Sequence, residues 1–168
     1  MIDLGIPTGI FNGLPWYEEP PRDRGHDCGE CGRLLKIYQR RLSRSMARGL
    51  FRLYVLGEKY PARQFFHVKH FDKEGARGEF GVLSSWELVV EQQNYDNQKK
   101  TSGMWAVTEF GKRFVLQQES VPQYVILKWG SELLGFAGRY VSAKECLEHG
   151  NKFKYDELMQ WTPGELSF

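Results

Sequence analysis

The segment from residue 43 to residue 61, SRSMARGLFRLYVLGEKYP, constrains the fold more than any other part of the chain. At 100° per residue, Met46, Leu50 and Leu53 fall on one side, as expected of an amphipathic helix that packs on a core. Ser43 is a candidate N-cap, and a glycine and a proline mark the end of the pattern. We therefore expect a helix of about four turns here.

The segment at residues 73–92, KEGARGEFGVLSSWELVVEQ, predicts a second short helix that runs into a strand. Its inward side chains would be Phe80, Leu83 and Trp86. Residues 92–103, QQNYDNQKKTSG, are polar and typical of a hairpin tip.

The next segment, MWAVTEFGKRFVLQ, predicts a returning strand followed by a helical turn. Together with the short apolar element PARQFFHVKHF, the chain order is helix, helix, helix, strand, polar tip, strand. That order is typical of a winged helix, a helix-turn-helix variant with a β-ribbon behind it. The predicted class is therefore α+β, with three helices and a β-hairpin wing.

These segments resemble the winged-helix core of MarR-type and PadR-type regulators. The resemblance includes a W-x-V-T-x-x-G pattern formed by Trp105, Val107, Thr108 and Gly111. Extended by CGECGRLLKIYQRRL before it and VPQYVILKWGSELLGF after it, the chain resembles small proteins carried by bacteriophages and prophages. The resemblance implies a DNA-binding viral protein whose helix at residues 77–86 enters a groove.

Charge is concentrated in one segment. Residues 33–52 hold seven basic side chains and no acidic one, whereas the rest of the chain holds 16 of the 23 basic residues and all 21 acidic ones. Such a segment indicates a polyanion or an acidic partner, and its alternative is a solvated helix face. The residues predicted to contact nucleic acid are Arg40, Arg41, Arg44, Arg48, Arg77, Ser84, Ser85, Lys99 and Lys100.

Cysteines and histidines suggest a structural zinc site. Cys28 and Cys31 have the spacing that lets two thiolates face one ion, and the glycine after them permits the turn. Cys146 and His149 have a similar spacing, which predicts a four-ligand set across the chain. Two alternatives remain: a set that includes His26, His67 or His70, and no metal at all, with the third cysteine in the core.

Composition and turn patterns divide the chain into three predicted parts. Residues 1–27 are rich in proline and glycine and are predicted to form an irregular arm. Residues 28–118 are predicted to hold the Cys-x-x-Cys segment and the winged helix. Residues 119–168 are predicted to form a hairpin and short helices that pack on the same core. Trp129 lies at the expected hairpin tip, either docked on a neighbouring element or offered to a partner or a second copy. Ser142 and Glu145 fit a capping box.

Several classes of function are not supported. The sequence lacks phosphate-loop, dinucleotide, zinc-protease and nucleophile-elbow motifs, so we expect no enzyme. It shows no apolar run of membrane-spanning length and no signal peptide pattern, and three cysteines is an odd number for a disulfide scaffold. We expect a cytoplasmic protein, in the host cytoplasm if phage-encoded. The leading hypothesis is DNA binding, and the alternative is binding and inhibition of a host protein complex, such as a defence system or a polymerase.

Overall fold

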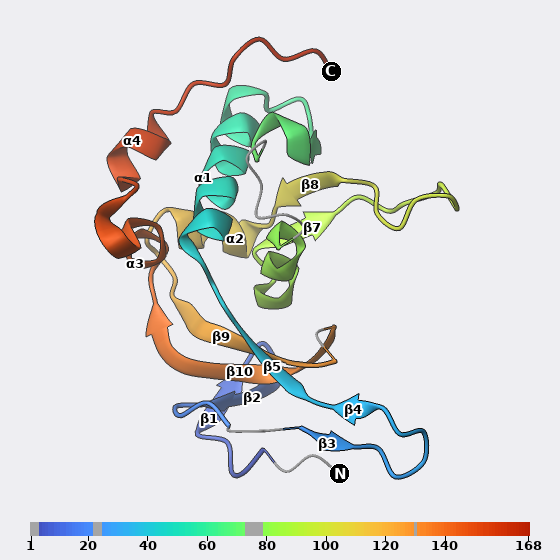
Figure 1. Ribbon diagram of the computed structural model, residues 1–168. Coiled ribbons are helices and arrows are strands. Elements are labelled where there is room, and N and C mark those ends of the chain that lie inside the picture. Colours follow the sequence, from blue (N-terminus) through green and yellow to red (C-terminus); the bar gives the residue numbers. More distant parts are fainter. Residues whose placement is uncertain (1–3, 22–24, 73–78, 130) are drawn as a thin grey trace. The chain divides into compact units, whose positions relative to one another are not determined.

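The computed structural model describes residues 4–21, 25–72, 79–129 and 131–168 (Figure 1). It has a mixed α+β architecture and divides into two compact units. Unit 1 comprises Met1–Leu42 and Val121–Val141, and unit 2 comprises Ser43–Ser120 and Ser142–Phe168. Within the residues described, no helix is long and apolar enough to cross a membrane.

Unit 1 is built on a five-stranded sheet with the order β1-β2-β10-β9-β5. Its neighbouring strands are antiparallel except for β2 and β10, which run parallel. The strands are β1 (Gly9–Phe11), β2 (Leu14–Tyr17), β5 (Ile37–Arg41), β9 (Val121–Lys128) and β10 (Glu132–Val141). The expected hairpin around Trp129 is thus confirmed as β9 and β10, which have long apolar runs because both faces of the central strands are largely buried.

The expectation of an irregular N-terminal arm is wrong. β1 and β2 form a hairpin closed by Asn12 and Gly13, both with positive φ (48° and 77°), which is the Asn-Gly turn preferred in two-residue hairpins. The hairpin is anchored on β10, since Phe11 packs edge-on to Phe136 at 4.7 Å and the Trp16 indole donates a hydrogen bond to the Gly138 carbonyl. The high proline and glycine content concealed this Asn-Gly signal.

A second, smaller ribbon in unit 1 carries the two N-terminal cysteines. It consists of β3 (His26–Asp27) and β4 (Leu34–Leu35), which are antiparallel with His26 opposite Leu35. The turn between them contains Cys28 and Cys31, and we call residues 28–33 the Cys turn.

Unit 2 is organised around the helix α1 (Arg44–Lys59). The predicted N-cap is confirmed, because the Ser43 hydroxyl accepts a hydrogen bond from the Met46 amide at 3.2 Å. The predicted apolar side chains Met46, Leu50 and Leu53 are all buried. A three-stranded sheet, order β6-β8-β7, contacts this helix through β8.

The other elements of unit 2 follow the expected order only in part, because the segment PARQFFHVKHF, counted as a helix in that order, holds a strand at Phe66–His67 and a 3-10 turn at Val68–His70. The elements are β6 (Phe66–His67), η1 (Val68–His70), η2 (Phe80–Trp86), β7 (Val89–Glu91), β8 (Met104–Val107), α2 (Glu109–Val115), α3 (Ala143–Glu148), η3 (His149–Asn151) and α4 (Tyr155–Met159). The second predicted helix is the 3-10 helix η2, and its inward side chains are buried as expected. The predicted capping box at the start of α3 is also present.

The pattern T-x-x-G after β8 has a local structural reason. Thr108 is the N-cap of α2, and its hydroxyl oxygen accepts a hydrogen bond from the Gly111 amide at 2.9 Å. A Cβ at Gly111 would overlap the carbonyl oxygen of Leu88. Only glycine therefore lets α2 pass this close to the segment that leads into β7.

The division of the chain differs from the predicted one. Residues 119–168 were expected to pack as one extension on the winged-helix core. In the structure, Val121–Val141 joins the N-terminal strands in unit 1, whereas Ser142–Phe168 joins unit 2. The reason is strand pairing, because β9 and β10 hydrogen bond to β5 and β2.

Candidate nucleic-acid interface

The prediction that Arg48 belongs to an exposed basic surface is wrong. Its guanidinium forms an ion pair with Asp72 (Nη2 to Oδ1, 3.6 Å), and the two side chains are 9% and 2% exposed. The same guanidinium lies 5.1 Å from the ring centre of Phe153. Arg48 therefore stabilises the interior of unit 2 and is not presented to a phosphate.

The rest of the basic face of α1 is also largely engaged within unit 2. Arg52 lies 5.4 Å from the ring centre of Trp161, and Arg44 donates a hydrogen bond to the His149 carbonyl at 3.2 Å. Arg44 is half-buried, so part of its guanidinium still reaches solvent. The helical periodicity located this face correctly, but it could not show that residues 149–161 cover it.

The predicted groove-reading helix is short. η2 ends at Trp86, its C-cap Glu87 has a positive φ of 58°, and Phe80, Leu83 and Trp86 repeat every three residues as a 3-10 helix requires. Ser84 is exposed and donates a hydrogen bond to the Gly81 carbonyl, while Ser85 is half-buried. Arg77 lies outside the described residues.

The loop at residues 92–103 joins β7 to β8 and reaches well beyond both strands (Figure 1). Lys99 and Lys100 lie near its tip and are exposed, and Lys99 pairs with Asp96 at 3.7 Å. Two local hydrogen bonds shape the tip: the Asp96 amide donates to the Asn94 side chain, and the Asn94 amide group donates to the Lys99 carbonyl. The loop therefore has a defined turn that holds two ammonium groups in solvent.

Arg40 and Arg41 are exposed on β5, an edge strand of the sheet in unit 1. They belong to a different unit from the serines of η2 and the lysines of the loop. Trp129, also in unit 1, is 51% exposed, and the ammonium of Lys128 lies 4.3 Å from the centre of its ring. The β9–β10 turn thus presents an aromatic ring beside a cation.

The predicted zinc ligands are likewise divided between the units. Cys28 is half-buried and Cys31 exposed in the Cys turn of unit 1, whereas Cys146 is buried on α3 and His149 is exposed in unit 2. Over the described parts of the chain, no three His, Cys, Asp or Glu side chains gather as a metal site. The four-ligand set stays a prediction.

The Cys28 thiol has a distinct electrostatic environment. Hydrogen bonds from the backbone of Cys31 and, next, of Glu30 lower its pKa below the usual value, and the Cys31 side chain adds to this effect. A lowered pKa favours the thiolate, which is the form that binds metal ions.

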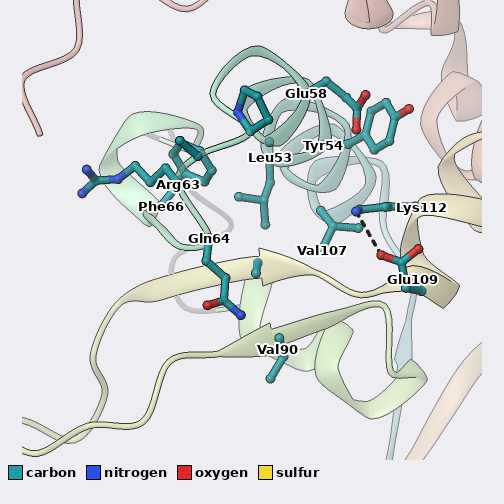
Figure 2. A pocket seen from close by; sticks show the side chains of 14 residues that line it. Leu53, Tyr54, Glu58, Arg63, Gln64, Phe66, Val90, Val107, Glu109 and Lys112 are labelled. Atoms are coloured by element: carbon teal, nitrogen blue, oxygen red, sulfur yellow. Dashed lines mark hydrogen bonds and ion pairs between the residues drawn. The ribbon is translucent and has the colours of Figure 1, made fainter.

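One cavity in unit 2 was not anticipated from the sequence (Figure 2). Its volume is about 420 Å³, and it lies among the end of α1, the segment after it, β7, β8 and the start of α2. Leu53, Phe66 and Val107 supply apolar walls. Lys112, near the rim, pairs with Glu109 at 3.0 Å (Figure 2).

The ion pair between Lys112 and Glu109 partly neutralises the charge at this cavity. Tyr54 also lines it, and burial, followed by the nearby Glu58 carboxylate, raises the pKa of its hydroxyl. The sequence signal for the cavity is weak, because its walls come from elements that are far apart in the chain.

Comparison of the chain with protein-family models, curated proteins and solved structures finds no match.

Proposed function

We propose that this chain is a DNA-binding protein without enzymatic activity, in which unit 2 acts as a winged helix. The observation that carries the proposal is the order of elements in unit 2. A helix, a short strand, η2 and two antiparallel strands follow one another, and β8 pairs with both β6 and β7. The loop at residues 92–103 then corresponds to the wing.

In this proposal the loop provides affinity and η2 provides a modest sequence preference. Lys99 and Lys100 contact phosphates through their exposed ammonium groups, and Arg44 adds a third contact. Ser84 and Ser85 offer hydroxyl groups, which both donate and accept hydrogen bonds and discriminate bases less strongly than a bidentate arginine or asparagine. Binding is therefore dominated by charge and is sensitive to salt.

The first test is duplex binding by fluorescence anisotropy over a range of salt concentrations. The double variant Lys99→Ala/Lys100→Ala is expected to bind more weakly and to lower the slope of log affinity against log salt by about 2, because two phosphate contacts are lost. The matched control is Lys144→Ala/Lys154→Ala, which removes the same charge from exposed positions of unit 2. Absence of duplex binding at about 50 mM salt, or an equal effect of both double variants, would contradict the proposal.

The alternative of a protein partner is favoured by exposed aromatic side chains. Tyr95 in the loop is 81% exposed and Trp129 is 51% exposed, and aromatic residues often anchor protein interfaces. If this alternative holds, Tyr95→Ala or Trp129→Ala abolishes capture of a host complex from nuclease-treated lysate, while Lys99→Ala/Lys100→Ala leaves capture unchanged. The phage origin of the chain remains part of the proposal.

A further inference from the structure

The backbone of the Cys turn is closed by two hydrogen bonds. The Cys28 amide donates to the Arg33 carbonyl at 2.7 Å, and the Gly32 amide donates to the Cys28 carbonyl at 2.9 Å. Gly32 has a φ of +68°, a conformation that glycine adopts without strain. The residue after the second cysteine thereby turns the chain into β4.

The two sulfur atoms of the Cys turn lie together. The Cys28 sulfur accepts hydrogen bonds from the backbone of Cys31 and Glu30, and the two cysteine side chains are hydrogen-bonded to each other. The two side chains thus already lie within hydrogen-bonding distance of each other, as two ligands of one ion must lie close together.

The ribbon around the Cys turn has almost no apolar core of its own. Between Tyr17 and Ile37, the described residues contribute no side chain to the buried core, and Leu34 is 54% exposed. β3 and β4 share only two residue pairs. Hydrophobic burial and strand pairing on this scale do not hold an isolated ribbon in one conformation in water.

We propose that Cys28 and Cys31 bind a zinc ion as two of its four ligands, and that the ion stabilises the β3–β4 ribbon. Zinc suits paired thiolates with a C-x-x-C spacing, and small segments without a core are commonly stabilised by such a site. This inference is independent of DNA binding, because it concerns residues of unit 1 that the proposed winged helix does not use.

The test uses the full, reduced chain loaded with Zn²⁺ or Co²⁺. Native mass spectrometry is expected to find bound zinc in the unaltered protein and in the control Glu30→Gln, and to find it lost in Cys28→Ser and Cys31→Ser. With Co²⁺, the thiolate charge-transfer band is expected to report at least two sulfur ligands. The proposal would be overturned if the unaltered protein held no zinc or if both serine variants retained it. A cobalt spectrum that reports fewer than two sulfur ligands would also overturn it.

Hydrogen exchange separates metal binding from a general effect on folding. Addition of Zn²⁺ is expected to slow exchange of the Leu34 and Leu35 amides in the unaltered protein and not in Cys28→Ser. Exchange of the core strands β9 and β10 should be alike in the metal-free forms of both proteins, because the side chains described in the ribbon are not among those that form the buried core. Unchanged exchange at β4 on addition of zinc would contradict a structural role for the ion.

Discussion

At the scale of single residues, burial decides what a charged side chain does. Arg48 and Lys99 both form ion pairs, at 3.6 and 3.7 Å, but Arg48 is buried and Lys99 is exposed. A buried pair tolerates the loss of one partner poorly, because the other charge is left without compensation in a medium of low polarity. An exposed pair is solvated already and contributes little to stability.

Asp72→Ala is therefore expected to destabilise the protein by about 3 kcal/mol, since the Arg48 guanidinium loses its buried carboxylate. Urea unfolding measures this loss. The control is Glu119→Ala, which breaks the exposed Arg113–Glu119 pair at 3.3 Å and is expected to cost less than about 1 kcal/mol. The exposed pair has the shorter distance, so distance alone would predict the larger loss of stability for Glu119→Ala. Equal losses of stability in the two variants would show that burial of Arg48 does not determine the effect.

At the scale of elements, local patterns predicted several elements of unit 2, but the segment PARQFFHVKHF, expected as a helix, contains the strand β6 and the 3-10 turn η1. The N-cap at Ser43, the capping box at Ser142 and the buried face of η2 all follow from residues close together in the sequence. The 3-10 type of η2 was not predicted, although Phe80, Leu83 and Trp86 repeat every three residues as such a helix requires. Helix–sheet order is local information, and it is the part of the fold that a sequence expresses most directly.

What the sequence did not predict depends on contacts between distant segments. The N-terminal strands are stabilised by β10, more than 100 residues further on, so their own composition suggested only an irregular arm. Arg48 is buried by residues from 72 and 153, and the cavity beside α1 is lined by three separate segments. Among the residues predicted to contact nucleic acid, Lys99 and Lys100 were placed in an exposed loop from the polar composition of residues 92–103 alone.

The β1–β2 hairpin gives a prediction at this scale. Gly13→Ala is expected to destabilise the protein by about 1 kcal/mol, because an alanine at a φ of +77° is strained. Gly57→Ala, inside α1 where a Cβ meets nothing within 4 Å, is expected to stabilise it by up to about 1 kcal/mol. Thermal unfolding measures both shifts, and an unchanged midpoint for Gly13→Ala would mean that the hairpin contributes little to the stability of unit 1.

At the scale of the whole molecule, charge limits how this chain would bind DNA under the proposed function. The formal net charge is only +2, so the proposed affinity depends on a few exposed cations and not on an overall positive field. After the burial of Arg48, the remaining predicted phosphate contacts described by the structure are Arg44, Lys99 and Lys100 in unit 2 and Arg40 and Arg41 in unit 1. Under the proposed function, participation of unit 1 would therefore account for much of the affinity for DNA.

If both units contact the same duplex, Arg40→Ala/Arg41→Ala lowers the slope of log affinity against log salt by about 2, as expected for two lost phosphate contacts. Combined with Lys99→Ala/Lys100→Ala, the reduction should be about 4, because contacts at separate phosphates release counterions independently. Anisotropy titrations of the three variants on one duplex measure these slopes. A slope unaffected by the arginine pair, together with a reduced slope for the lysine pair, would restrict DNA binding to unit 2 and leave unit 1 with the Cys turn as its chemically distinctive feature.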